Sequence, residues 1–428
     1  MGGFGGFGSG LYDGPSLLGR GGSGVGITGL ESLPIRLSAG VRGTYNSNIL
    51  GFSVDENGNY KPIASAGAEG TVSIAGQRRF RRAYLGVNYL GGYAHNNKLA
   101  FNNGSNQGMN IGASGRVSGR WVLSGQGMAG ISNRVLGNIG FASISEAEFI
   151  AAPLTELFDS RAYFMGTSAS ATYFKDRRNS FRFSGVGSTV RRKARTLADM
   201  QSYGASGDWV YRLNQRTSLG VSYQFSHFDF FKIFGDTDIH MVGVHTGRSF
   251  GRDWQINLSL TGMQQSTVGV RRIELEPVLA QLLGRSSGSE VFESNNLLYG
   301  GSAQVSRTLR RATITGGVGR GINPGNGFFI SSINEHVDVS VRYASSRRSS
   351  VNFMVAHSRM SSLGFASGKF KTTMYGTSFS YRLMDSLSLD MSADGRTIDL
   401  QQTQFGRRGY QVTIGIGYHP SRGLFSSR

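Results

Sequence analysis

The chain has 428 residues, a formal net charge of +19 and no cysteine. Only 39% of its residues are hydrophobic, and its 64 glycines are about twice the share found in an average globular protein. This composition argues against several soluble domains with packed cores. No stretch approaches the roughly 18 consecutive apolar residues of a transmembrane helix. The favoured architecture is a closed sheet with one face in lipid and the other in water.

The N-terminal residues 2–32 are rich in glycine and show no periodicity. They predict a flexible extension before the first strand, with a plug or a surface-associated tail as alternatives. The opening MGGFGGFGSG lacks the basic residues and apolar core of a secretory signal, so that either a signal has been removed or the start is misplaced. We expect an extension at 1–32, a barrel at 33–419 and a tail at 420–428.

The rest of the chain alternates apolar and small polar residues with the period of a β-strand. In one segment Leu258 and Leu260 fall on one face, and Asn257 and Ser259 fall on the other. Met241 beside Val242 leaves the facing of one strand open. The predicted strands, in chain order, are 33–45, 64–76, 84–94, 109–119, 121–131, 162–174, 181–190, 203–212, 218–228, 239–248, 254–264, 297–305, 312–320, 337–343, 351–357, 373–383, 387–393 and 410–419.

The connections switch between short, arginine-rich turns and long polar loops. Strands joined in this way form an antiparallel sheet, and an even number of them brings the first and the last together. We therefore predict an all-β fold, a closed antiparallel up-and-down transmembrane β-barrel of about 18 strands, within a range of 16–20.

Much of the positive charge lies in the short turns, at one end of the predicted barrel. Arginines there would keep the rim solvated or meet anionic lipid headgroups, so nucleic acid is not expected as a partner. The basic turn residues are Arg78, Arg79, Arg81, Arg82, Arg120, Lys175, Arg177, Arg178, Arg216, Arg252, Arg307, Arg310, Arg311, Arg347 and Arg348.

This arrangement resembles the outer-membrane porins of Gram-negative bacteria over nearly all of the chain after Ser32. Porin-like barrels end on a strand with an aromatic residue, as Tyr418 does here, whereas the tail 419–428 departs from that habit. The resemblance implies a bacterial outer-membrane location, periplasmic short turns, external long loops, membrane lipids as partners and a homo-oligomer as one form of assembly. Aromatic residues near strand ends would form interfacial girdles; they are Tyr84, Trp121, Tyr163, Tyr173, Phe181, Trp209, Tyr211, Trp254, Tyr343, Tyr381 and Tyr418.

No enzyme motif is found in the sequence. The segment GFASGK at 364–369 fails as a phosphate loop in its spacing and in the phenylalanine that follows the lysine. His240 and His245 are five positions apart and face opposite sides of one strand, which argues against a metal site. We expect no catalytic residue, no metal and no cofactor.

Two long loops contain helix-like spacing interrupted by a proline, at 143–158 and 271–283. Loops of this length are commonly functional. The first belongs to the third long loop, which by the resemblance would fold into the barrel and narrow the pore. Its carboxylates at the constriction would be Glu146, Glu148, Glu156 and Asp159. The sixth loop, 266–294, is nearly as long and is the alternative constriction.

Strand alternation assigns seven arginines to the lumen wall: Arg36, Arg42, Arg116, Arg182, Arg212, Arg342 and Arg382. The same face carries Asp208, Asp338, Asp390 and Asp394. An acidic loop against a basic wall would set up a transverse field that filters solutes by size and charge. The alternative is that these are ordinary solvated lumen residues paired with one another.

The function that the sequence favours is a pore for passive diffusion of small hydrophilic solutes, with a mild preference for anions. One alternative is an export barrel for a polysaccharide or another secreted polymer, which would have a wider lumen without a constriction. Another is a non-transporting barrel that anchors a surface assembly, which bilayer conductance would distinguish from the other two.

Overall fold

The computed structural model of the chain describes residues 35–47, 52–54, 60–98, 103–132, 161–193, 198–231, 235–251, 253–274, 281, 286–324, 331–363, 369–400 and 405–419. Among these residues, no helix is long and apolar enough to cross a membrane. The strands, in chain order, are β1 (Ile35–Asn46), β2 (Phe52–Val54), β3 (Tyr60–Pro62), β4 (Ser65–Arg79), β5 (Ala83–Asn96), β6 (Gly104–Arg116), β7 (Trp121–Ser132), β8 (Ala162–Phe174), β9 (Asn179–Arg192), β10 (Asp199–Arg212), β11 (Thr217–Phe231), β12 (Gly235–Phe250), β13 (Trp254–Glu274), β14 (Ser287–Thr308), β15 (Ala312–Pro324), β16 (Ser331–Ala344), β17 (Ser349–Ser362), β18 (Lys369–Met384), β19 (Leu387–Leu400) and β20 (Phe405–Tyr418).

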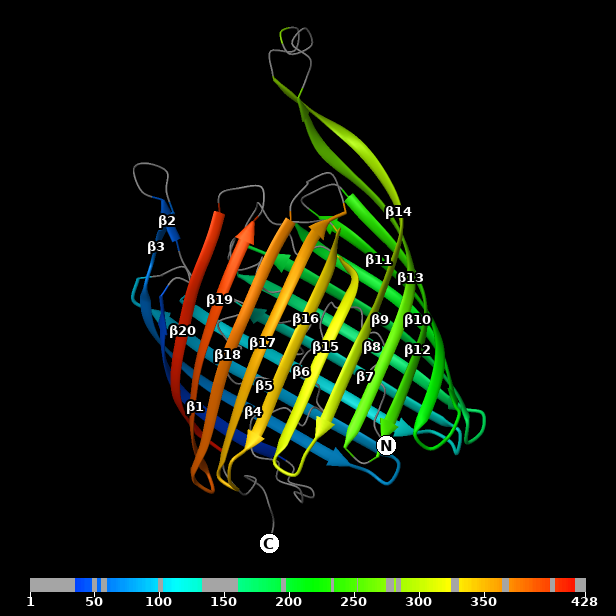
Figure 1. The fold of residues 1–428 in the computed structure, drawn as a ribbon, viewed down its shortest axis with the longest axis horizontal. Coiled ribbons are helices and arrows are strands. Elements are labelled where there is room, and N and C mark those ends of the chain that lie inside the picture. Colours follow the sequence, from blue (N-terminus) through cyan, green and yellow to red (C-terminus); the bar gives the residue numbers. More distant parts are fainter. Residues whose placement is uncertain are drawn as a thin grey trace.

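Eighteen of these strands form one closed antiparallel sheet, and β2 and β3 form a separate small hairpin. β1 pairs with β4 on one side and with β20 on the other. Ala39 lies opposite Tyr418 and Asn46 lies opposite Gln411, which joins the two ends of the sheet. Figure 1 shows the result as a barrel of tilted strands. The prediction of a closed barrel of about 18 antiparallel strands is confirmed.

Local hydrogen bonds hold the short turns. Between β8 and β9, the Asp176 carboxylate accepts hydrogen bonds from the Asn179 side chain at 2.9 Å and from the amides of Arg178 and Asn179 at 2.7 and 2.8 Å. These bonds, that of the Asn179 side chain first, lower the pKa of Asp176 below its ordinary value. Between β12 and β13, Gly251 has a φ of 63°, a left-handed conformation that glycine adopts without strain.

The sixth long loop is shorter than the sequence suggested. β13 continues to Glu274, β14 begins at Ser287, and the two strands pair along their whole length. The helix-like interpretation is therefore wrong for residues 271–274, because the alternation of Val268 and Val270 extends the ladder instead. In Figure 1 the β13–β14 hairpin rises well above the other strands. The first long loop likewise contains paired strands, β2 and β3.

Successive residues along each strand face opposite sides of the wall. On β13, Leu258 and Leu260 are 46% and 70% exposed, whereas Ser259 between them is only 5% exposed. The ladder preserves this division, since Leu260 lies opposite Val244 of β12 and Ser259 lies opposite Ser302 of β14. The outward face is apolar and the inward face is polar, which is the division found in outer-membrane-type barrels.

Aromatic residues gather on the outward face near both ends of the strands. Near the short turns, the rings of Trp121 and Tyr173 lie with centroids 4.9 Å apart. Towards the long loops, the rings of Phe225 and His240 are 5.0 Å apart. Two such levels are typical of the girdles at the two interfaces of a bilayer.

Tyr84 departs from this pattern. Its neighbour Leu85 is exposed on the outward face, and Tyr84 itself lies opposite Arg79 and Ser114 in the inward phase of the ladder. The prediction that Tyr84 belongs to a girdle is wrong, because Tyr84 lies near a strand end but faces the lumen.

Candidate functional site

Hydroxyl groups line the inward face and pair across neighbouring strands. Five serine pairs form hydrogen bonds: Ser38 with Ser73, Ser124 with Ser170 at 2.7 Å, Ser184 with Ser206 at 2.6 Å, Ser188 with Ser202 at 2.7 Å, and Ser259 with Ser302 at 2.8 Å. The two members of each pair are direct partners in the ladder, where facing side chains come within bonding distance. These paired hydroxyls make that part of the wall hydrophilic without adding charge.

Two carboxylates on the inward face, those of Asp338 and Asp394, lie against glycines on the neighbouring strand. Asp338 is the ladder partner of Gly317, and Asp394 is the partner of Gly376. A Cβ atom at Gly317 would lie 2.8 Å from Oδ1 of Asp338, and one at Gly376 would lie closer still to Asp394. The glycines thus leave space for carboxylates that would otherwise project into the path of a solute. This use of glycine is visible only once the register is known.

Arg42 and Glu69 form a buried ion pair across the β1–β4 ladder. Arg42 Nε donates to Glu69 Oε2 at 2.8 Å, and Nη2 donates to the same oxygen. The two side chains are only 7% and 5% exposed. Removing one charge from such a site leaves the other poorly solvated. Arg42 is one of the seven arginines assigned to the wall, whereas Glu69 was not singled out from the sequence.

The other six arginines assigned to the wall occupy the inward phase of their strands, near the short turns. Arg116 and Arg212 end β6 and β10, and Arg342 and Arg382 lie close to the ends of β16 and β18. Arg182 lies near the start of β9. For Arg36, near the start of β1, the structure describes the backbone alone. The structure thus brings these six arginines together at the short-turn end of the barrel. Their effect on which solutes pass through the lumen stays a prediction.

Part of this positive charge is compensated along the wall. Asp208 is the ladder partner of Arg182, and its Oδ1 lies 3.6 Å from His245 Nε2. Within the described ranges, no group of three or more His, Asp or Glu side chains is arranged to hold a metal ion.

The four carboxylates expected at the constriction, Glu146, Glu148, Glu156 and Asp159, lie outside the described residues. The described chain ends β7 at Ser132 and resumes at Arg161, directly before β8. Both points belong to the long-loop end of the barrel. The constriction stays a prediction.

The inward face also carries a hydrophobic cluster that was not predicted. Its buried members lie towards the long-loop ends of β9 to β12, and Phe164, Met241 and Ile322 pack against them. Val242 is 57% exposed on the outward face, so Met241 faces inward, which settles the facing of this strand. In the sequence, the signal was the replacement of inward serines by phenylalanines at the end of β11. We call this cluster the inner apolar patch: Val190, Ala198, Met200, Phe228, Phe230 and Ile239.

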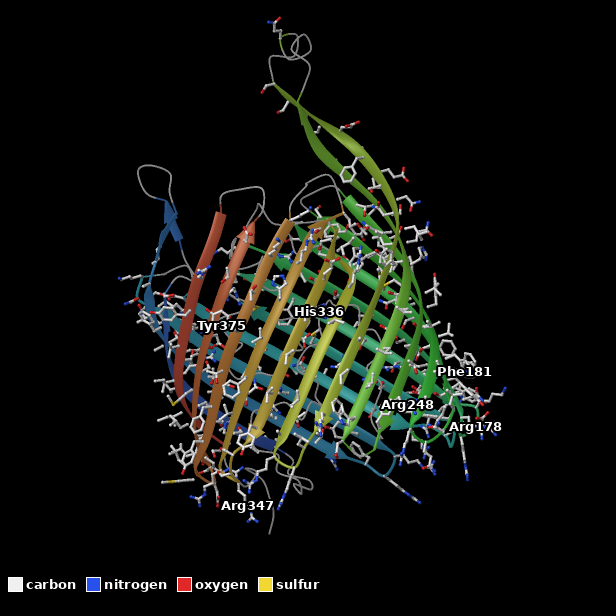
Figure 2. All side chains as sticks on the ribbon, in the orientation of Figure 1. Arg178, Phe181, Arg248, His336, Arg347 and Tyr375 are labelled. Atoms are coloured by element: carbon white, nitrogen blue, oxygen red, sulfur yellow. The ribbon has the colours of Figure 1, made fainter. Side chains whose placement is uncertain are left out.

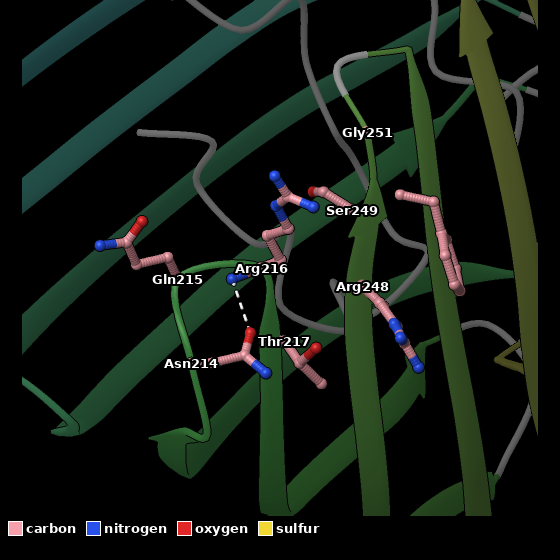
Figure 3. Close-up of a pocket in the computed structure, with 8 residues that line it drawn as sticks. Asn214, Gln215, Arg216, Thr217, Arg248, Ser249 and Gly251 are labelled. Atoms are coloured by element: carbon pink, nitrogen blue, oxygen red, sulfur yellow. Dashed lines mark hydrogen bonds between the residues drawn. The ribbon is translucent and has the colours of Figure 1, made fainter.

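The short-turn rim combines arginines with aromatic rings. Arg248 Cζ lies 4.4 Å from the centroid of the Phe250 ring, and Arg307 Cζ lies 4.8 Å from that of Trp254. Figure 3 shows a shallow pocket between two adjacent turns, where Asn214 accepts a hydrogen bond from the Arg216 amide at 2.8 Å. Figure 2 shows Arg248 and Arg347 near the same end of the barrel. Cations over aromatic rings suit a membrane interface.

Comparison with known proteins finds similarity in structure alone. No protein-family model matches the chain, and no curated protein matches it. Similar solved structures from Pseudomonas aeruginosa include OccK2 (OpdF), with 11% identity and a TM-score of 0.46 over 90% of this chain and 98% of that one. OpdK with vanillate has 10% identity and a TM-score of 0.46 over the same shares. The siderophore receptor PirA has 9% identity and a TM-score of 0.41 over 90% of this chain and 80% of that one.

The architecture of this chain is that of a porin-like, outer-membrane-type barrel. Its eighteen strands close into one antiparallel sheet, its outward face is apolar, and its inward face is polar apart from the inner apolar patch. The function proposed below rests on the residues of the chain itself.

Proposed function

We propose that the barrel is a pore for passive diffusion of small hydrophilic solutes across a bacterial outer membrane. The observation that carries this proposal is the hydroxyl-paired inward wall behind an apolar outward face. The apolar face is stable only against lipid, and the closed ladder satisfies the backbone there. Serine pairs and flattened carboxylates offer a solute hydrogen bonds without strong attraction to any one charge, so transport needs no covalent step.

We further propose a mild preference for anions, set by the inward arginines near the short turns. Replacing Arg116 and Arg212 together by glutamine should shift the selectivity of the pore towards cations, because both side chains are exposed on the inward face. The measurement is the reversal potential in a planar bilayer under a KCl gradient. Arg347→Gln, in the turn between β16 and β17, is the matched control and should change the potential less. An equal shift in both variants would contradict the assignment.

The third long loop is proposed to narrow this pore and to carry the acidic side of its field. Deleting residues 146–156 should raise the single-channel conductance, because the cross-section open to ions increases. Neutralising Glu146 and Glu148 in the full-length chain should shift selectivity further towards anions. Insertions and deletions in the β2–β3 hairpin, which belongs to another long loop, are the control: they should leave the conductance unchanged if the effect is specific to the third loop. Unchanged conductance and reversal potential in both loop variants would rule out this constriction.

A further inference from the structure

The ladder between β14 and β15 ends earlier than its neighbours. β14 pairs with β13 from Ser287 to Arg307, but with β15 only from Gly301 to Thr308. β15 nevertheless continues past Arg320 to Pro324, paired with β16 on its other side. Above Gly301 and Arg320 the two hairpins therefore separate, and Figure 1 shows β13–β14 rising away from its neighbours. We call this separation, between 287–300 of β14 and 321–324 of β15, the fork.

The fork results from an inward displacement of the loop end of β15 and β16. Ile322 follows Val318 and Arg320 in the outward phase of β15, yet it packs against the inner apolar patch. Gln265 of β13 donates from Nε2 to the Ser331 hydroxyl of β16 at 2.5 Å, although β14 and β15 separate these strands in the sheet. Two independent contacts thus hold this hairpin end on the inner side of β12 and β13.

The base of the fork lies where outward apolar residues give way to charged ones. Val318 is 46% exposed below it, and Arg320 follows at the fork itself. Arg320 Nη1 lies 3.6 Å from Glu335 Oε1, and its Cζ lies 4.5 Å from the centroid of the Tyr299 ring on β14. Glu335 is in turn the ladder partner of Arg359 on β17, so that the three charged residues form one row across neighbouring strands. Charges beside an outward aromatic ring mark a membrane–water interface.

The two sides of the fork have complementary chemistry. On the β14 side, Leu297 and Tyr299 are 85% and 72% exposed, which is unusually high for large apolar groups. On the other side, one row of ladder partners carries three basic residues, Arg320, Arg359 and Lys371, against two acidic ones, Glu335 and Asp399. At an interface water can solvate backbone groups that would be costly to leave unpaired in hydrocarbon. A molecule with one apolar chain and one anionic head satisfies both sides.

We propose that the fork is a lateral portal through which a single-chain anionic amphiphile of the fatty-acid type passes between the lumen and the membrane. While the amphiphile crosses the fork, its chain contacts Leu297 and Tyr299. On the membrane side its head stays at Arg320 and Arg359, at the interface, and its chain extends past Val318 into the hydrocarbon. This inference rests on the proposed pore, because the lumen must hold water for the head to reach the fork.

Single-channel recording with dodecanoate tests the portal, and hexanoate serves as a probe with the same head but a chain too short to anchor in the membrane. Dodecanoate should reduce the KCl current, whereas hexanoate at the same concentration should not. Changing Arg320 and Arg359 to glutamine should raise the half-blocking concentration about tenfold, the effect of weakening binding by about 1.4 kcal/mol. Arg347→Gln, at the opposite rim, should leave it unchanged. Equal block by both acids, or equal values in all variants, would overturn the portal.

Bridging the fork gives a second test, for which the absence of native cysteine is an advantage. A flexible bis-maleimide should link Tyr299→Cys on the β14 side of the fork to Ile322→Cys on the β15 side, each two residues beyond the last ladder pair, Gly301 and Arg320. This link should abolish block by dodecanoate and retain KCl current. The same reagent on Gln265→Cys with Ser331→Cys, which fixes the hairpin end in its inward position, should preserve the block. Loss of block in both bridged proteins, or in neither, would contradict the proposal. Absence of KCl current before any amphiphile is added would instead refute the pore, and the portal with it.

Discussion

Replacing Met109 by arginine should prevent most of the chain from assembling as a barrel. Met109 lies in the middle of β6 with 48% of its surface exposed on the outward face, between ladder partners Tyr89 and Ala129. An arginine on the lipid face near the bilayer midplane costs about 2–4 kcal/mol. The folded fraction, measured by heat-modifiable gel mobility after reconstitution, should fall sharply.

Gly108 provides the matched control for this substitution. It precedes Met109 on the same strand and faces inward, and no atom lies within 4 Å of the position that its Cβ would take. Gly108→Arg therefore places the same charge in a wet lumen and should assemble nearly as well as the unmodified chain. If both variants lose the folded barrel equally, the assignment of outward and inward faces is wrong.

Replacing Arg42 by alanine should cause the largest loss of stability among substitutions on the inward face. Glu69 would keep its buried position without the guanidinium that donates to it. Breaking a buried pair by removing one partner costs about 3–5 kcal/mol. Unfolding in urea from detergent micelles, followed by tryptophan fluorescence, should show a midpoint shifted to lower denaturant.

A double-mutant cycle separates the pair from the space that its side chains fill. Arg42→Gln and Glu69→Gln each leave one buried charge without its partner, whereas the double variant removes both charges and should cost less than the sum of the two single variants. Additive effects of the single and double substitutions would show that Arg42 acts through packing and not through Glu69.

Much of the barrel could be predicted because the pattern that defines each strand depends only on residues close together in the sequence. Alternation with period two depends on neighbouring residues only, and β8 was predicted with the bounds that the structure gives it, Ala162–Phe174. Closure followed from the order of short and long connections, and the ladder between β1 and β20 confirms it. The seven wall arginines were assigned by the same alternation, whereas the crowding of six of them near the short turns depended on where each strand ends.

The features that could not be predicted depend on the register between neighbouring strands, and the sequence of one strand does not contain that register. Glu69 could be matched with Arg42 only when β4 was aligned with β1, and the space at Gly317 has meaning only beside Asp338. The fork is a further case, because Ile322 reads as an outward residue by alternation and leaves that face through contacts with distant strands. The end of β13 was predicted too early, because the polar residues 264–267 suggested a loop although the ladder with β14 continues through them.

Single-channel recording of the purified barrel in a planar bilayer tests the central claim most directly. If the lumen is a water-filled pore, insertion should produce discrete current steps that are ohmic in KCl and are reduced when a neutral polymer small enough to enter the lumen is added. Folded barrels that insert, as shown by heat-modifiable mobility and protection from protease, and yet carry no current would contradict the assignment as a diffusion pore.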